Sequence, residues 1–236
     1  MSSSCGFIDT SGEFVIPPIY EHVTEFSEGR AHFSAGGRIG FLSHGGREVI
    51  RMQFGEADWF HEGLAAVMTW DPVLHAPTTS RSRAYARRQQ TKPMGYIDRA
   101  GDYAIEPAFI VAGEFAEGLA DVEYDIGKWG FVDPAGNIRH VEADCLYSFR
   151  EGYARFQAED GRYGFVDTEL RVVIPPIYRS VFDFHEGLAW ATEDLGQKRS
   201  YFLDPDGERV LTFDTYCDEE FSDGLLSVRH GDLWGS

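Results

Sequence analysis

The sequence predicts an all-β fold of six tandem repeats, each about 34 residues long, because three short landmarks recur in step. The first landmark is Phe, a variable residue, an acid and Gly, and it occupies 26–29, 60–63, 115–118, 149–152, 184–187 and 221–224. The second is Gly, an aromatic residue, an aliphatic residue and usually Asp, and its copies lie within 5–9, 39–43, 94–98, 129–133, 163–167 and 200–204. The third is Val-Ile-Pro-Pro-Ile-Tyr or a variant of it, at 15–20, 49–54, 104–109 and 173–178.

The second and third landmarks together predict a β-hairpin, since Phe, Ile and Val favour pleated, half-buried strands. In the first copy, Asp9 can accept hydrogen bonds from the backbone ahead of it, and Gly12 can adopt the positive φ that closes the turn. The fifth copy reads Asp-Thr-Glu-Leu at 167–170, so a less tight turn is expected there. Because proline cannot donate to a ladder, the Pro-Pro step predicts either the end of a strand or an edge strand.

The first landmark introduces a further strand, such as RAHFSA at 30–35 or LAAVMTW at 64–70, which a short turn links to the next hairpin. Each repeat is therefore predicted to be a meander of about three strands, with a short fourth strand over 19–26. One such sheet cannot bury its apolar face alone, so neighbouring repeats are expected to stack.

This repeated unit resembles the WG-repeat family, also called KWG repeats, which is found mainly in bacteria. The resemblance runs from Gly6 to Gly235, but the tryptophan itself is kept only at Trp129 and Trp234, and Tyr201 replaces the glycine in the sixth copy. The family is defined by its repeat rather than by an activity. The resemblance therefore implies an architecture and leaves the function open.

Stacking of six repeats favours a closed, β-propeller-like ring, with an open twisted β-repeat array as the alternative. Residues 225–230 can pair with 6–10 and so complete one sheet from the two ends of the sequence. Residues 1–236 are thus predicted to form a single repeat domain. The ending DLWGS also fits a structural repeat segment of a larger protein.

Charge limits the classes of partner. The chain has 21 Lys and Arg against 39 Asp and Glu, a formal net charge of -18. Such a surface repels nucleic acid and anionic lipid and attracts cationic partners. The three cysteines follow no disulfide or zinc spacing, and neither a signal peptide nor a membrane-spanning run is evident, so a cytoplasmic protein is expected. The oligomeric state is left open, with a monomer favoured.

A His-Glu pair occurs twice, at 61–62 and 185–186, and suggests an acid/base site. The repeat alignment argues against one, because the histidine position also accepts Ala116 and Arg150. Since no catalytic or metal-binding motif is found elsewhere, the sequence predicts a protein that is not an enzyme and carries no metal or cofactor.

The acid of the first landmark is present in every copy and is interpreted as structural, an acceptor for backbone N–H groups of the adjacent turn. The alternative is a ring of acids that binds a cation or basic side chains. These repeat acids are Glu28, Glu62, Glu117, Glu151, Glu186 and Asp223.

Two further sets are candidates for partner binding. The residue before the repeat Phe is acidic in four of six copies and predicts an acidic face, formed by Glu25, Glu114, Asp183 and Glu220. The second repeat carries an extra basic stretch at about 71–92, predicted to be a protruding loop. Trp, Tyr and Arg are the usual hot-spot residues, so the docking candidates of this loop are Trp70, Arg81, Tyr85, Arg87 and Arg88. The alternative is a flexible insertion without a partner.

These observations favour a non-enzymatic protein-binding scaffold. Its most specific version is a bacterial immunity or inhibitor protein whose acidic surface neutralises a cationic toxin or enzyme. The alternative from another class is a small-ligand, carbohydrate-binding or enzymatic site in the central channel of the ring.

Overall fold

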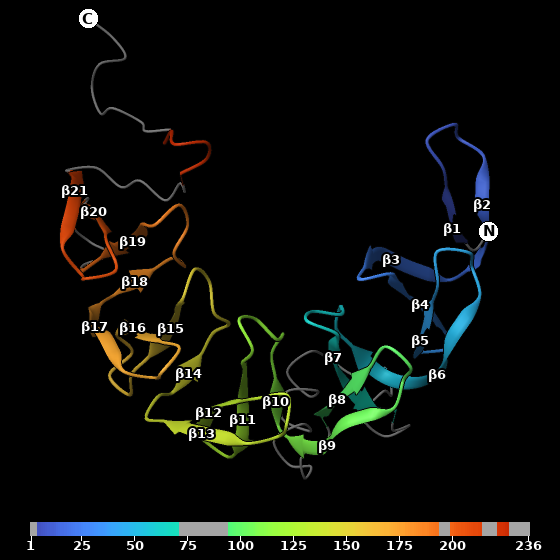
Figure 1. The fold of residues 1–236 in the computed structure, drawn as a ribbon, viewed down its shortest axis with the longest axis horizontal. Helices are drawn as coiled ribbons and strands as arrows, with labels where there is room; N and C mark the ends of the chain where they lie inside the picture. Colours follow the sequence, from blue (N-terminus) through green and yellow to red (C-terminus); the bar gives the residue numbers. More distant parts are fainter. Residues whose placement is uncertain (1–3, 71–93, 194–198, 214–220, 227–236) are drawn as a thin grey trace, which may run out of the picture. The chain divides into compact units, whose positions relative to one another are not determined.

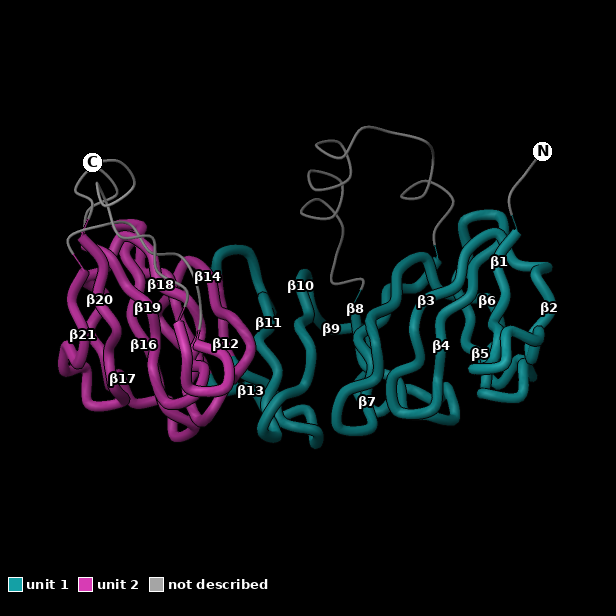
Figure 2. Tube along the Cα trace, turned by 90° about the horizontal axis from the view of Figure 1, so that it is seen from above, with its two compact units in different colours: residues 1–127, 131–139 teal, residues 128–130, 140–236 magenta. Residues whose placement is uncertain are grey.

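The computed structural model describes residues 4–70, 94–193, 199–213 and 221–226, and it forms two compact units (Figures 1 and 2). Unit 1 contains residues 1–127 and 131–139, and unit 2 contains residues 128–130 and 140–236. The described part of the chain is built of antiparallel strands and turns. It contains no helix, and hence none that could cross a membrane.

The strands are β1 (Cys5–Ile8), β2 (Phe14–Tyr20), β3 (His22–Ser27), β4 (Arg30–Ala35), β5 (Arg38–Leu42), β6 (Glu48–Ala57), β7 (Leu64–Thr69), β8 (Met94–Asp98), β9 (Tyr103–Phe109), β10 (Val111–Ala112), β11 (Ala120–Asp125), β12 (Lys128–Val132), β13 (Ile138–Val141), β14 (Cys145–Leu146), β15 (Tyr153–Gln157), β16 (Tyr163–Asp167), β17 (Val172–Tyr178), β18 (Ser180–Val181), β19 (Ala189–Thr192), β20 (Ser200–Leu203) and β21 (Arg209–Phe213). They form three four-stranded sheets (β10–β13, β14–β17, β18–β21), the pair β1–β2, and a seven-stranded sheet in the order β3 to β9. The all-β, repeated-meander prediction is confirmed for the described residues.

The boundaries of the sheets are offset from those of the sequence repeats. In the sheet β14–β17, the first two strands belong to the fourth repeat and the last two to the fifth. The short strand predicted over 19–26 is found as β3, and short strands β10, β14 and β18 precede the repeat Phe in the third, fourth and fifth repeats. The seven-stranded sheet arises because β6 pairs with β5 through Phe41↔Ile50 and continues to pair with β7 through Ala57↔Val67.

The glycine before the aromatic residue is required by the strand that crosses it. A Cβ on Gly164 would lie 2.5 Å from the carbonyl oxygen of Ile174. The pairs Tyr163↔Tyr178 and Phe165↔Ile174 leave Gly164 alone opposite three residues of β17, a bulge that contains the Pro-Pro step. Strand β17 does not end at its prolines, and it is the edge strand of its sheet, so the second of the two expectations is right.

In five of the six repeats, an aromatic pair packs the first landmark on the preceding hairpin. The Phe of the first landmark contacts the aromatic residue of the hairpin before it, with ring centroids 4.8–5.1 Å apart in the five pairs. These pairs are Phe7–Phe26, Phe41–Phe60, Tyr96–Phe115, Phe165–Phe184 and Phe202–Phe221. Aliphatic residues of both sheets complete each cluster, so the repeats bury their apolar faces against one another.

The hairpin turns follow their predicted chemistry. Asp9 Oδ1 accepts hydrogen bonds from the backbone N–H groups of Ser11 (2.8 Å) and Glu13 (3.1 Å). The Ser11 hydroxyl and these N–H groups hold the pKa of Asp9 below its ordinary value. Gly12 closes the turn at φ +89°.

The turn at 167–170 corrects one prediction. It is as tight as the others, because Leu170 N donates to Asp167 O at 2.8 Å, against 3.0 Å for the equivalent bond in the first hairpin. Leu170 adopts φ +64°, a conformation that costs a residue with a Cβ roughly 1 kcal/mol. Leu170 thus adopts the positive φ that a glycine has in the other turns, at a cost in backbone strain, and the turn stays closed.

Candidate interaction surface

The first landmark forms a two-residue hairpin turn. In the second repeat, His61 and Leu64 exchange both backbone hydrogen bonds, at 2.9 and 3.0 Å, while Glu62 and Gly63 have φ of +52° and +85°. Two consecutive positive φ values define a type I′ turn, whose usual sequence is Asn-Gly or Asp-Gly. Glutamate is therefore not the residue that this backbone favours, and its recurrence needs another cause.

The side chain of the glutamate supplies that cause, because it reaches the same turn of the next repeat. The bonds join Glu28 to Gly63 N (2.8 Å), Glu62 to Gly118 N (2.9 Å), Glu151 to Glu186 N (2.9 Å) and Gly187 N (2.8 Å), and Glu186 to Gly224 N (2.9 Å). Aspartate would suit the turn better but is one methylene shorter. Each carboxylate thus satisfies backbone donors and ties one repeat to the next. Glu117 (φ +56°) and Asp223 (φ +53°) occupy the equivalent turn positions.

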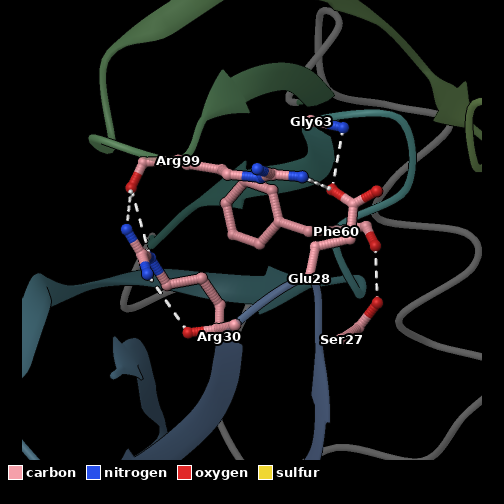
Figure 3. Close-up of polar contacts among 7 residues, drawn as sticks. Ser27, Glu28, Arg30, Phe60, Gly63 and Arg99 are labelled. Carbon is pink, nitrogen blue, oxygen red and sulfur yellow. Dashed lines mark hydrogen bonds and ion pairs between the residues drawn. The ribbon is translucent and has the colours of Figure 1, made fainter. Parts of the chain in front are cut away.

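The first of these turns carries additional contacts (Figure 3). The Arg99 guanidinium donates to Glu28 Oε2 at 2.7 Å, and Arg30 donates to the carbonyl oxygen of Arg99 at 3.1 and 3.3 Å. Ser27 Oγ donates to Phe60 O at 2.6 Å. Partial burial acts to raise the pKa of Glu28, but the bonds from Arg99 and Gly63 outweigh it and the pKa lies below its ordinary value.

The residues before the repeat Phe differ in how far they face solvent. Glu25 is exposed. Glu114 is half-buried, with Oε2 3.0 Å from His61 Nε2, and Asp183 is half-buried, with Oδ1 3.1 Å from Arg155 Nε. Glu220 lies outside the described residues. The acids predicted to share a face therefore combine one exposed carboxylate with two that also contact side chains of this chain, His61 and Arg155.

The same position in the second repeat holds Trp59, which sequence reasoning did not select. Its side chain is 45% exposed. Its backbone N–H is capped by Asp58 Oδ1 at 2.8 Å, and its ring stacks on His32 with centroids 6.2 Å apart. His32 is buried, and its Nε2 donates to Asp58 O at 2.6 Å. Burial lowers the pKa of His32 below its ordinary value. The signal in the sequence was an aromatic residue at a repeat position that is acidic in four of the six copies.

The basic loop at about 71–92 lies outside the described residues, together with Arg81, Tyr85, Arg87 and Arg88. Trp70, at its start, is half-buried, and the Arg38 guanidinium lies 4.3 Å from the centre of its ring. Trp70 is thus in contact with a strand of its own unit, which leaves only part of its surface for a partner.

The His-Glu pairs do not come together as a catalytic site. His61 pairs with Glu114, and Glu62 bonds to Gly118 instead of to its neighbour. His185 is exposed. Among the described residues, no three His, Cys, Asp or Glu side chains are grouped so that they could hold a metal ion.

The comparisons with known proteins agree with the repeat. A family model described as "WG containing repeat" matches residues 6–37, 39–69, 94–129 and 163–194, more than half of the chain. No curated protein sequence matches the chain.

Solved structures show similar folds at low identity. BamB from Moraxella catarrhalis is 9% identical over 83% of this chain and 61% of its own, with a TM-score of 0.44. Hsv2p from Kluyveromyces lactis is 10% identical over 80% of this chain and 63% of its own, with a TM-score of 0.48. A chain of the mitotic checkpoint complex is 12% identical over 90% of this chain and 69% of its own, with a TM-score of 0.43. The chain thus spans about three fifths of the length of BamB and Hsv2p.

Proposed function

Because the chain belongs to the family of WG-containing repeat proteins, we propose that it is a non-enzymatic scaffold that binds a basic protein. One observation carries the proposal. Trp59, 45% exposed, occupies the repeat position that is acidic in four of the six copies, on a chain of net charge -18. An exposed Trp among carboxylates suits a Lys or Arg side chain, which gains from the ring face and from the negative charge together.

Contacts in unit 1 place the residues at this repeat position on adjacent segments. Ser27 Oγ bonds to Phe60 O, which brings the segment of Glu25 against that of Trp59. His61 pairs with Glu114, which brings the following segment alongside. Glu25, Trp59 and Glu114 occupy the same position in three successive repeats, and together they are the docking column of the proposal.

The most specific form of the proposal is a cytoplasmic immunity or inhibitor protein of a bacterium, which covers a cationic toxin or enzyme. The surplus of acids supports it, because opposite charge accelerates encounter and disfavours wrong partners. The glutamate ties between successive turns also support it, since a rigid scaffold loses little entropy when it binds.

The proposal includes a closed ring of six stacked repeats in place of an open twisted array. The recurrence of one packing arrangement, an aromatic pair in five of the six repeats, supports a regular stack that can close. Small-angle X-ray scattering distinguishes a ring from an array by the maximum dimension of the particle.

The test of binding is an affinity purification from the source cells with three baits: the wild type, Trp59→Ala and a control, Glu13→Gln. Glu13 is an exposed acid outside the docking column. We expect one basic protein to be retained by the wild type and the control, with an affinity at least about tenfold lower for Trp59→Ala, the usual loss at an aromatic hot spot. Binding should weaken as salt rises. An acidic partner, or equal retention by all three baits, would overturn the proposal.

A further inference from the structure

The first hairpin lacks a strand that the hairpins of the other five repeats have beside them. In those repeats the strand with the hairpin aromatic lies between two neighbours, as β5 does between β4 and β6 and β16 between β15 and β17. Among the described residues, β1 pairs with β2 alone (Figure 1). The backbone N–H and C=O groups along the outer edge of β1 can therefore pair with a strand from elsewhere.

The side chains of the first repeat also show that this strand is missing. The hairpin aromatic is at most 2% exposed in the other five repeats, where it is Phe41, Tyr96, Phe131, Phe165 and Phe202. Phe7, its equivalent, is half-buried, and so is Phe26, whose ring centroid lies 4.9 Å away. Ile8 is 60% exposed, whereas its five equivalents are 0% exposed. Apolar side chains thus line the free edge of β1.

The strands that fill this place in other repeats define what fits it. In four repeats the residue opposite the equivalent of Ile8 is an alanine that is at most 1% exposed: Ala31, Ala65, Ala154 and Ala189. The residue opposite the equivalent of Gly6 is apolar and at most 4% exposed: Phe33, Val67, Phe156 and Ala191. The edge of β1 therefore fits a strand with an alanine and, two positions later, a second apolar residue.

The residue between these two lies opposite the hairpin aromatic, and its charge can be inferred from unit 2. There Arg155 lies opposite Phe165, and its Nε is 3.1 Å from Oδ1 of Asp183, the acid before the next repeat Phe. Glu25 is the equivalent acid of the first repeat and is exposed. No residue that the structure describes forms an ion pair with its carboxylate. A Lys or Arg opposite Phe7 would give Glu25 the partner that Asp183 has.

We propose that the free edge of β1 binds an extended segment of the basic partner as an antiparallel strand. This strand carries alanine opposite Ile8 and lysine or arginine opposite Phe7. The inference rests on the proposed function above and adds the site and the mode of binding. The edge is continuous with the docking column, because the bond from Ser27 Oγ to Phe60 O brings the segment of Glu25 against that of Trp59.

Two other occupants suit the edge less well. Residues 225–230 of this chain place Leu226 where four repeats bury an alanine, and Ser227 where Glu25 lacks a cation. A second copy is disfavoured by the net charge of -18, which opposes self-association. The ring proposed above depends on packing between sheets and not on which chain supplies this strand.

Cys5 allows the edge to be tested in the full chain, with a peptide in place of the partner. The peptide copies residues 151–158, EGYARFQA, because β15 fills the equivalent edge, and carries cysteine at the position of Gln157, which faces the equivalent of Cys5. Cys145 and Cys217 of the protein are replaced by Ser. Disulfide exchange is run to equilibrium in 2-mercaptoethanol, and the peptide adduct is measured by intact mass.

We expect this peptide to label Cys5 at least about threefold more than the same peptide with Arg155→Glu, because the charge change replaces attraction to Glu25 by repulsion. Glu25→Lys in the protein should reverse the preference. Glu13→Lys is the matched control, an exposed acid in the same hairpin, and should leave the preference unchanged. Equal labelling by both peptides, or a preference that Glu25→Lys does not alter, would overturn the proposal.

The other occupants give their own results. An intramolecular disulfide between Cys5 and Arg229→Cys would assign the edge to residues 225–230, since that register places position 229 opposite Cys5. A Cys5-linked dimer whose yield falls on dilution would assign it to a second copy. Either result would overturn the proposal. If the peptide fails to label Cys5 while affinity purification retains a basic protein, this site is wrong and the proposed function stands.

Discussion

Two hairpins of unit 2 have the same fold but differ in the residues at their strand and turn positions. The hairpin β16–β17 keeps the strand glycine, Gly164, and the Pro-Pro step, but its turn has Leu170 in place of glycine. The hairpin β20–β21 keeps the turn glycine, Gly207, but has Tyr201 in the strand and no proline in β21.

The difference shows that the strand glycine and the Pro-Pro bulge depend on each other. In β16–β17 the bulge brings the backbone of β17 onto Gly164. In β20–β21 the pairs on both sides of Tyr201↔Thr212 are in regular register, so there is room for a side chain, and Tyr201 is 6% exposed. The turn glycine varies independently of both features.

The largest effect is expected at Tyr201. Tyr201→Gly should reduce the free energy of unfolding by about 4 kcal/mol, because it removes a buried aromatic ring and places a glycine in a strand. It also removes the ring over which the Arg209 guanidinium lies at 4.0 Å. Denaturant unfolding measures the loss, and Tyr201→Phe, which keeps the ring, should stay within about 0.5 kcal/mol of the wild type. A small effect of Tyr201→Gly would mean that the bulge can form without its prolines.

The reciprocal change tests the crowded strand. Gly164→Ala should cost about 2–3 kcal/mol, since the new Cβ would meet backbone atoms that cannot move aside, Ile174 O at 2.5 Å and Pro176 N at 2.8 Å. Denaturant unfolding again gives the value. If Gly164→Ala proved neutral, the Pro-Pro segment would have to be mobile, and the coupling between glycine and bulge would be wrong.

The turns should respond in the opposite directions. Leu170→Gly should stabilise the protein by about 1 kcal/mol, because it relieves the positive φ of a residue with a Cβ, and Gly207→Ala should destabilise it by a similar amount. Thermal unfolding of both variants checks the pair. Destabilisation by Leu170→Gly would show that the Leu170 side chain contributes more packing than its backbone costs in strain.

The sequence was sufficient for most local features of the hairpins, but not for the turn at 167–170. Asp9 and Gly12 identified the turn, and the recurring Phe identified the residues that pack between sheets, as Phe26 does on Phe7. The family resemblance is confirmed by the matching repeat model. These features depend on residues that are adjacent in the chain or occur in every copy, so a pattern reveals them.

The sequence also missed contacts with partners from other repeats, the strain in one local turn and the exposure of one aromatic residue. That Glu28 bonds to Gly63 cannot be read from either turn alone, because the bond spans 35 positions and requires the stacking geometry. The strain at Leu170 was missed because a missing glycine was taken to mean an open turn. Trp59 was overlooked because exposure of an aromatic residue is a property of the folded surface and not of the local pattern.

The smallest effect concerns the ion pair between Arg171 and Asp167 in the hairpin β16–β17. Burial acts to raise the pKa of Asp167, but the hydrogen bonds and charge of Arg171 outweigh it, so the pKa of Asp167 is lowered. A lowered carboxyl pKa contributes stability above the unfolded-state pKa, near 4, and this contribution is lost as pH falls through the folded-state value. Arg171→Leu should therefore lower the free energy of unfolding only slightly at pH 7, as expected for a cation at the surface, and the difference from the wild type should shrink as pH falls below the unfolded-state pKa of the carboxyl. Urea unfolding across pH measures it, with Arg209→Leu as the matched variant of the second hairpin. A difference that persisted unchanged at low pH would show that Arg171 acts through its aliphatic stem and not through Asp167.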